Sequence, residues 1–416
     1  MKNIYADIIT IGDEILYGQI TDTNSQWISA ELDKIGIRTK RKSSVSDKEV
    51  DILEVIKEAE KRSDIILITG GLGPTNDDIT KKTLARYFNS ELSLHETALK
   101  DVTEFFTRRG RELTETNKGQ AFLPSNCTYI PNRSGTAPGM WFEQNGKIIM
   151  SMPGVPHEMK ELMTMEVLPR LVNHFKTPVI VHQLIKTIGI GESNLADLIK
   201  PWEDQLPEHI GLAYLPSLGE VKLRLTATGE TEELLKSAID KEVIKLKELI
   251  SDYIFGYTDE PLEKVLGDSL KAKKLTIAIA ESCTGGFLSH LFTSISGSSD
   301  YFKGSIIAYD NEIKTSLLDV SEETLRNFGA VSEHTVKEMA EAVRKKMNSS
   351  IGVAVSGIAG PGGGTEEKPV GTIWIAYSDA NKTITRKLIL STRRDVNIRL
   401  ASYSLLNLIR QEILQP

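Results

Sequence analysis

The chain has 416 residues, with 57 acidic and 50 basic side chains and a net charge of −7. This length is too great for a single hydrophobic core, so we predict two or three domains, and the acidic balance argues against a general nucleic-acid-binding surface. Only Cys127 and Cys283 are present, which excludes a disulfide framework and favours a reducing compartment. The start lacks the apolar core of a signal peptide and no run is long enough to span a bilayer, so we expect a cytoplasmic protein that does not enter a membrane.

Strands alternate with helices over residues 1–174, which predicts an α/β domain with a mostly parallel sheet covered on both faces. The expected strands are 4–11, 64–69 and 147–152, and the expected helices are 24–34, 47–62, 79–88, 96–109 and 157–172. The loop after the second of these strands is the first candidate site. Gly70, Gly71 and Gly73 let the backbone approach an anionic ligand, and the following helix start offers free N–H groups.

Four acidic residues accompany this loop. Asp77 and Asp78 would supply oxygen ligands of the kind that Mg²⁺ prefers, and Asp13 with Glu14 ends a different strand of the same sheet. Two ordinary explanations stay open, because a Gly-Gly loop is often only a turn and Asp at a helix start complements the dipole. The spacing differs from the Walker P-loop and from the dinucleotide fingerprint.

Residues 175–257 are predicted to form a small α+β domain, after a looser stretch that suggests a boundary. The expected order is strand 179–188, helix 192–200, strands 211–215 and 220–228, and helix 231–249. Its outline is similar to KH-type RNA modules, but it offers no basic aromatic surface, and Gly189-Ile-Gly191 is not a Gly-x-x-Gly clamp. We expect a spacer or a dimerisation element, and a homodimer.

The third domain, residues 258–416, again alternates helices and strands and is predicted to be α/β. We expect helix 262–273, strand 275–280, a helix, strand 304–309, a helix, helix 333–347, strands 351–356, 370–377 and 383–390, and a long helix from 393.

The strand at 275–280 turns into a helix through Ser282, Cys283, Thr284, Gly285 and Gly286. The first N–H groups of a helix have no internal partner and can hold an oxyanion or a phosphate, so a nucleophile would be useful in this turn. The N–H groups of Cys283, Thr284, Gly285 and Gly286 are the expected oxyanion donors. The alternative is that Ser and Thr only cap the helix and Cys fills space.

Ser282 is the favoured nucleophile because Lys314 is expected at the same sheet edge. A desolvated lysine has a lowered pKa and can take the serine proton, with Tyr309 as a hydrogen-bond partner or proton relay. An exposed helix lysine is the ordinary alternative. Cys283 is intrinsically more nucleophilic but would need a base such as His290 or His334.

A second glycine-rich loop, 357–364, contains five glycines in eight residues, more than a turn requires. Such a loop after a strand suits close backbone contact with a phosphate. The expected contacts come from Gly357, Ala359, Gly360, Gly362 and Gly363, with Thr372 or a nearby lysine.

Several longer motifs run through the chain: Gly12-Asp-Glu-Ile-Leu16, Thr69-Gly-Gly-Leu-Gly-Pro-Thr75, Asp77-Asp78, Gly135-Thr-Ala-Pro-Gly139, Pro153-Gly-Val-Pro156, Ala280-Glu-Ser-Cys-Thr-Gly-Gly286, Gly329-Ala-Val-Ser-Glu333, Gly357-Ile-Ala-Gly-Pro361 and Lys368-Pro-Val-Gly-Thr372. With these motifs the whole chain resembles the CinA (competence/damage-inducible protein A) family. The family name suggests a DNA-uptake or repair factor, but the acidic balance speaks against direct DNA binding.

The resemblance implies two hydrolytic activities on small nucleotides. The C-terminal domain looks like nicotinamide-nucleotide amidases, which convert nicotinamide mononucleotide to nicotinate mononucleotide and ammonia without a cofactor; Ser282 is then the nucleophile, assisted by Tyr309 and Lys314. The N-terminal domain is similar to molybdopterin-binding domains, and in this family it is associated with ADP-ribose pyrophosphatase activity that needs a divalent metal, Mg²⁺ or a transition metal. An alternative is that this domain only binds a pterin or a nucleotide.

Overall fold

The computed structural model describes residues 3–75 and 78–414. It divides the chain into two compact units, one formed by residues up to 181 together with 228–236 and one formed by the remainder. Among the described helices, none has both the length and the apolar character that crossing a bilayer requires.

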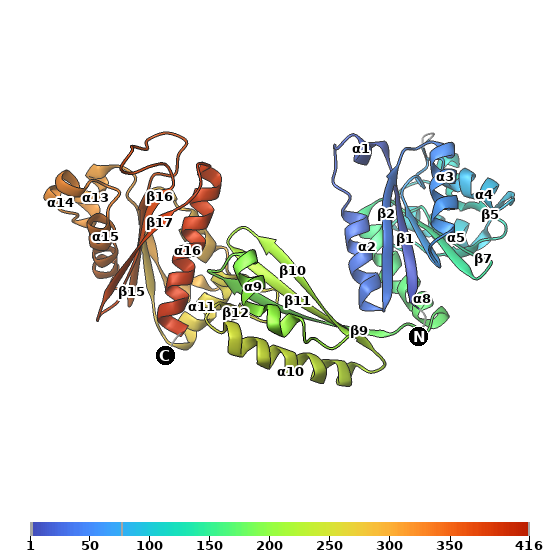
Figure 1. Ribbon diagram of the computed structural model, residues 1–416. Helices are drawn as coiled ribbons and strands as arrows, with labels where there is room; N and C mark the ends of the chain where they lie inside the picture. The colour runs from blue at the N-terminus through green and yellow to red at the C-terminus, as the bar shows by residue number, and fades with distance from the viewer. Residues whose placement is uncertain (1–2, 76–77, 415–416) are drawn as a thin grey trace. The chain divides into compact units, whose positions relative to one another are not determined.

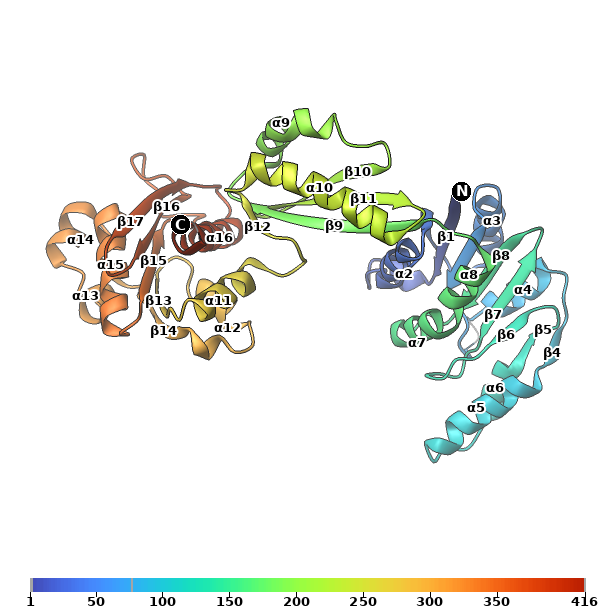
Figure 2. The same cartoon turned by 90° about the horizontal axis from the view of Figure 1, so that it is seen from below.

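A six-stranded sheet forms the centre of the N-terminal unit, in the order β2-β1-β3-β8-β7-β6 (Figures 1 and 2). Four neighbouring strands are parallel: β2 (Ile37–Val45), β1 (Ile4–Ile11), β3 (Ile65–Thr69) and β8 (Lys147–Met152). The other two, β7 (Gly139–Gln144) and β6 (Thr128–Ile130), are antiparallel. The mostly parallel sheet is confirmed. The sequence did not predict β2, because its run of basic and hydroxyl side chains is typical of an edge strand and lacks the apolar pattern.

Helices cover both faces of this sheet and enclose two apolar cores. Side chains of α2 (Thr23–Lys34), α7 (Pro156–Leu162) and α8 (Leu168–His174) fill one core, and those of α3 (Glu49–Glu60), α4 (Thr80–Tyr87) and α5 (Glu96–Arg108) fill the other. A π-helical turn, Met163–Val167, joins α7 to α8. The smaller elements are α1 (Asp13–Leu16), α6 (Glu115–Lys118), a 3₁₀ turn at Gly119–Ala121, and the pair β4 (Leu92–Leu94) and β5 (Phe122–Pro124).

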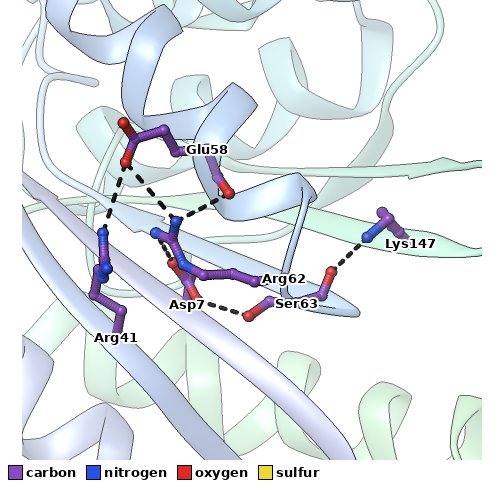
Figure 3. A network of polar contacts seen from close by, with 6 residues as sticks. All are labelled: Asp7, Arg41, Glu58, Arg62, Ser63 and Lys147. Atoms are coloured by element: carbon purple, nitrogen blue, oxygen red, sulfur yellow. Dashed lines mark hydrogen bonds and ion pairs between the residues drawn. The ribbon is translucent and has the colours of Figure 1, made fainter.

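A polar network lies near the amino ends of β3 and β8 (Figure 3). Asp7 on β1 is 1% exposed and accepts hydrogen bonds from Arg62 at 2.5 Å and from the Ser63 hydroxyl at 2.6 Å. Arg62 also donates to the Glu58 carbonyl at 3.0 Å, and Lys147 donates to the Ser63 carbonyl at 2.8 Å. The buried carboxylate is therefore paired and hydrogen-bonded, which a buried charge requires.

The middle domain has a four-stranded sheet in the order β10-β11-β9-β12. Its elements are β9 (Val179–Ile188), α9 (Glu192–Glu203), β10 (Ile210–Ser217), β11 (Glu220–Gly229), α10 (Glu232–Ile250) and β12 (Ile254–Gly256). The predicted β-α-β-β-α order is confirmed, and the short β12 adds an edge strand to it.

The C-terminal domain is a three-layer α/β structure around a five-stranded sheet, β14-β13-β15-β16-β17. Strands β14 (Phe302–Ile307), β13 (Ile277–Glu281) and β15 (Ile351–Gly357) are parallel, and β16 (Thr372–Ser378) and β17 (Thr383–Ile389) complete the sheet antiparallel. One face is covered by α11 (Leu262–Ala272), α12 (Phe287–Thr293) and α16 (Arg394–Leu414), and the other by α13 (Asn311–Leu318), α14 (Glu322–Phe328) and α15 (Glu333–Lys346). A 3₁₀ turn, Ser298–Asp300, precedes β14.

The middle and C-terminal domains share a core. Ile188 and Phe255 of the middle domain pack into the apolar cluster of the C-terminal domain. Arg410 on α16 is 3% exposed and donates to the carbonyls of Asp252 at 2.5 Å and Ile254 at 3.1 Å. These contacts hold the second half of α16 against the end of the middle domain.

Candidate active sites

Three parallel strands of the C-terminal sheet end at one edge, and the predicted site residues follow them. Ser282 comes directly after β13, the strand between β14 and β15, and its N–H donates to the Val355 carbonyl at 3.0 Å. The N–H of Ala308, just after β14, donates to the Glu281 carbonyl at 2.7 Å. The structure therefore brings the nucleophile turn, the segment before α13 and the start of the glycine loop 357–364 to the same sheet edge.

The carboxylate of Glu281, which sequence reasoning did not single out, organises this turn. Glu281 is fully buried, and its Oε2 accepts from the Thr284 hydroxyl at 2.6 Å and from the N–H groups of Gly286 at 3.0 Å and Leu288 at 3.2 Å. Its Oε1 accepts from the N–H of Ser289 at 2.8 Å and from the hydroxyl of the same residue. The protein's own carboxylate thus occupies the anion position at the start of α12.

Two of the expected oxyanion donors are consequently occupied. The N–H of Gly286 donates to Glu281, and the N–H of Gly285 donates to the Ser282 carbonyl at 3.1 Å. The expectation that Gly285 and Gly286 supply oxyanion donors is therefore wrong. Within the described chain the N–H groups of Cys283 and Thr284 donate to no other residue, so these two remain available.

Lys314 is a buried residue, and its interpretation as an exposed helix lysine is wrong. It is 1% exposed, and its Nζ donates to the carbonyls of Ala308 at 2.7 Å and Tyr309 at 3.2 Å. Burial lowers the pKa of Lys314, an effect that the charges of Asp310 and an ionised Cys283 would oppose. Its ammonium is thus tied to the carbonyls beside the nucleophile turn, and no hydrogen bond joins it to Ser282 in the described chain.

The cysteine alternative finds little support in the geometry. Cys283 is 5% exposed, and burial raises the pKa of its thiol to about 12, so the thiolate is scarce near neutral pH. His290 is exposed on α12, and His334 stacks on Phe328 with a ring separation of 3.8 Å. Neither histidine hydrogen-bonds Cys283 within the residues that the structure describes.

Arg394 at the start of α16 is a site residue that the sequence did not reveal. Its Nη2 donates to the Tyr309 hydroxyl at 3.0 Å, and its Nη1 donates to the Gly360 carbonyl at 3.1 Å. A guanidinium has five N–H donors, so Arg394 keeps donors for an anion at this edge. Only the fold brings it there, because Tyr309 and Arg394 are 85 residues apart in sequence.

One part of the glycine loop 357–364 is held by side-chain hydrogen bonds, and another part is exposed with free N–H groups. Asn397 donates to the Ala359 carbonyl at 3.0 Å, and Arg394 holds the next carbonyl, that of Gly360. Gly362 and Gly363 are exposed, and their N–H groups donate to no other residue of the described chain. The open part of the loop can therefore contact an anion through its backbone.

Burial contradicts the predicted phosphate contact of Thr372, whereas the contact of Gly357 stays a prediction. Thr372 begins β16, is 1% exposed, and its hydroxyl is buried without a partner, so it cannot reach an open anion site. Gly357 ends β15 opposite Ile373, and an added Cβ would lie 2.9 Å from the backbone of that residue. Packing between strands explains this glycine.

A cavity of about 480 Å³ opens in the N-terminal domain beyond the carboxyl ends of β1, β3 and β8. Gly70, Gly71 and Gly73 line it as predicted, with Gly70 and Gly71 at φ values of +112° and +64°. The N–H groups of Gly71, Leu72 and Gly73 donate to no other residue of the described chain. Successive free N–H groups of this kind form an anion-binding concavity.

The predicted acidic residues separate in the structure. Glu14 and Asp78 line the cavity, whereas Asp13 does not; its N–H donates to Asp47, and its carboxylate accepts from Tyr17 at 3.4 Å. Asp13 is therefore not part of the cavity lining, and its role as a metal ligand stays a prediction. Asp77 lies outside the described residues.

Two further acidic residues, Asp47 and Glu158, line the same cavity, and no described Lys, Arg or His does. An anionic phosphate would need cations in such surroundings, and oxygen donors alone suit Mg²⁺ or a similar hard metal. Among the described residues no three His, Cys, Asp or Glu side chains come close enough together to hold a metal ion. The residues therefore fit Mg²⁺ only in its usual arrangement, with one or two carboxylates and the phosphates of the ligand.

Comparison with known proteins gives the family of the chain. Residues 7–173 match a family model described as a probable molybdopterin binding domain, residues 182–256 the damage-inducible protein CinA KH domain, and residues 259–413 the CinA C-terminal domain. A CinA-like protein of Cytophaga hutchinsonii is 57% identical over 411 residues, 99% of this chain and 98% of that protein. The chain belongs to the CinA family.

Two further proteins are similar to this chain. A CinA-like protein of Flavobacterium psychrophilum is 46% identical over 412 residues and covers 99% of both chains. A crystal structure described as the protein CinA with unknown function, from Thermoplasma acidophilum, is 33% identical, covers 41% of this chain and 98% of that chain, and has a TM-score of 0.38. This CinA-family protein thus has a molybdopterin-binding-like domain, a KH-like domain and a CinA C-terminal domain in that order.

Proposed function

We propose that the C-terminal domain hydrolyses the carboxamide of nicotinamide mononucleotide, giving nicotinate mononucleotide and ammonia. The observation that supports this proposal most is the meeting of Ser282, the buried amine of Lys314 and the Arg394–Gly360 contact at one sheet edge. An amide hydrolase of this kind needs a nucleophile, a proton acceptor and donors for the developing oxyanion. This edge offers a candidate for each.

In the proposed mechanism Ser282 attacks the carboxamide carbon and its proton passes to neutral Lys314, whose pKa burial lowers. The N–H groups of Cys283 and Thr284 stabilise the oxyanion. Lys314 returns the proton to the departing ammonia, and water then hydrolyses the acyl-enzyme to release nicotinate mononucleotide. Arg394 and the N–H groups of the open glycine loop hold the 5′-phosphate, an anion that a guanidinium binds well. These steps require no metal.

Replacement of the nucleophile tests this assignment. Ser282→Ala should lower ammonia release from nicotinamide mononucleotide at least about 1,000-fold, because loss of a nucleophile removes the covalent route. Cys283→Ala is the matched control and should retain most of the activity. Full activity of Ser282→Ala, or equal loss in Cys283→Ala with an unchanged circular dichroism spectrum, would contradict the serine assignment.

We also propose that the N-terminal domain hydrolyses ADP-ribose to AMP and ribose 5-phosphate with the help of a divalent metal. The specific observation in favour is a cavity that combines three free N–H groups with acidic side chains and, among described residues, no basic one. Glu14 and Asp78 are the candidate ligands. When bound, the metal would supply neutralisation of phosphate charge and activation of water. The N–H groups of Gly71, Leu72 and Gly73 would orient the pyrophosphate.

Incubation with ADP-ribose, with and without Mg²⁺, tests the second activity. AMP and ribose 5-phosphate should form only with the metal, and Asp78→Asn should lower their rate of formation. Unchanged cleavage in the presence of a chelator would refute metal dependence. Calorimetric titration with a pterin and with ADP-ribose separates the alternative, a domain that binds without cleaving.

A further inference from the structure

We propose that Glu158 hydrogen-bonds the terminal ribose of ADP-ribose and so selects this sugar nucleotide over a plain nucleoside diphosphate. The inference rests on the proposed ADP-ribose substrate and adds to it a residue that determines specificity. The terminal ribose is the part of ADP-ribose that ADP lacks, so a residue that separates the two ligands must contact it.

The carboxylate of Glu158 is held in place at the wall of the cavity. It comes from α7, and its Oε2 accepts a hydrogen bond from Asn132 Nδ2 at 2.7 Å. Asn132 is 9% exposed, and its Nδ2 also donates to the carbonyl of Ala137, another lining residue, at 2.9 Å. A buried amide thus fixes one carboxylate oxygen, and within the described chain Oε1 accepts no hydrogen bond.

The loop beneath Glu158 is shaped to receive this carboxylate. An added Cβ on Gly135 would overlap both carboxylate oxygens of Glu158. Gly135 is not among the glycines with positive φ, so its backbone conformation does not require glycine, and an added methyl group would act by displacing the end of the Glu158 side chain. Gly135 therefore provides the space in which the Glu158 carboxylate lies.

The chemistry of the cavity favours a hydroxyl group as the partner of Glu158. A carboxylate accepts hydrogen bonds, and an acidic residue that accepts from ribose hydroxyls is a common device in nucleotide-binding folds. Glu158 does not join Glu14 and Asp78 in a three-residue metal site within the described chain. The cavity thus presents N–H donors at Gly71–Gly73 for an anion and an acceptor at Glu158 for a hydroxyl, which together suit a phosphoribosyl group.

Binding of two uncleavable ligands tests this role in the full chain. The probes are the α,β-methylene analogues of ADP-ribose and of ADP, titrated by calorimetry in the presence of Mg²⁺. Glu158→Gln should weaken binding of the ADP-ribose analogue about 10- to 100-fold and leave binding of the ADP analogue unchanged. The reason is that the replacement amide oxygen can keep the Asn132 hydrogen bond, which turns an NH₂ donor towards the cavity.

Two more variants sharpen the test. Gly135→Ala should weaken binding of the ADP-ribose analogue and not of the ADP analogue, because the new methyl group displaces the Glu158 carboxylate. Glu161→Gln is the matched control: Glu161 lies on the same helix and accepts from Ser134 in the same loop, but does not line the cavity. Its two dissociation constants should equal those of the wild type.

Three results would overturn the proposal: unchanged affinities in Glu158→Gln, equal weakening of both analogues, or no binding of the ADP-ribose analogue to the wild type. Cleavage of ADP-ribose itself is measured separately. If the selective loss is seen but the wild type cleaves nothing, the proposed reaction fails and the role of Glu158 stands. If the wild type cleaves ADP-ribose and the selective loss is absent, the proposed reaction stands and the proposed role of Glu158 fails.

Discussion

In both the N-terminal and the C-terminal domains, hydrogen bonds fix ionisable side chains that are largely removed from solvent. Glu281 holds the nucleophile turn by accepting five hydrogen bonds. One comes from Thr284, one each from Gly286 and Leu288, and two from Ser289. Lys314 is held by two carbonyls, and the half-buried Lys81 on α4 donates to those of Gly119 at 3.0 Å and Gln120 at 3.2 Å. In each case burial of a charge is accompanied by hydrogen bonds that fix its position.

Loss of the Glu281 carboxylate should loosen the nucleophile turn. Glu281→Ala leaves several buried donors without an acceptor, so we expect the opening free energy of α12 to fall by about 3 kcal/mol. Hydrogen exchange at Gly286, Leu288 and Ser289 measures it. Glu312→Ala is the control, because Glu312 also lies in the first turn of a helix but is exposed. Equal protection in the two variants would show that Glu281 does not hold the turn.

Lys81 should make the N-terminal domain more stable at high pH. Burial lowers the pKa of Lys81 from 10.5 to about 8, so between these values the unfolded chain binds more protons and stability rises with pH. The free energy of unfolding of the wild type, relative to Lys81→Met, should increase by about 2–3 kcal/mol from pH 8 to pH 10.5. Urea unfolding across this range measures the difference.

Lys82→Met provides the comparison for this prediction. Lys82 is the next residue and is exposed, so the stability of Lys82→Met should depend on pH in the same way as that of the wild type. If the free energy of unfolding of Lys81→Met changes with pH in parallel with that of the wild type, the pKa of Lys81 is not lowered by folding.

At the scale of elements, α16 contacts both the candidate site and the middle domain. Its first residue, Arg394, contacts Tyr309 and the glycine loop 357–364 at the candidate site. Its second half carries Arg410, whose guanidinium holds the carbonyls of Asp252 and Ile254. One helix of 21 residues therefore links the candidate site of the C-terminal domain to the KH-like domain.

Removal of the Arg410 guanidinium should loosen the domain junction. Arg410→Ala leaves two carbonyls without their donor, and we expect a loss of about 2–4 kcal/mol in stability. Limited proteolysis of the segment around residues 252–258 should become faster. Arg399→Ala, an exposed position on the same helix, should digest like the wild type. Unchanged cleavage of Arg410→Ala would show that this contact does not secure the junction.

At the scale of the whole molecule, the two candidate sites belong to different units and share no residue. One proposed reaction proceeds through a serine ester without metal, and the other requires a divalent cation. The two chemistries are therefore expected to be separable by point mutation. Homodimerisation and a cytoplasmic location stay predictions.

A reciprocal pair of variants tests this independence. Ser282→Ala should abolish ammonia release and retain ADP-ribose cleavage within about twofold, and Asp78→Asn should do the opposite, because changes at independent sites that share no residue act separately. Chelation should affect only the second activity. Loss of both activities in either single variant would show that the sites are coupled.

The order of elements and the positions of both glycine loops could be predicted from the sequence. The strand, turn and helix around Ser282 and the loop at Gly70–Gly73 are local patterns of apolar, polar and glycine residues, and such patterns reflect backbone geometry over a few residues. The parallel strands then bring the loops that follow them to one edge, which is the reason for expecting Ser282, Lys314 and the glycine loop 357–364 at one edge of the sheet.

The tertiary structure alone decided which groups are free and which are occupied. Arg394 reaches Tyr309 across 85 residues, and Asn132 reaches Glu158 across 26. Glu281 takes an N–H group that was expected to face substrate, and Thr372 is buried beneath the sheet edge. These outcomes depend on hydrogen bonds and packing between segments distant in sequence, and no local pattern encodes them.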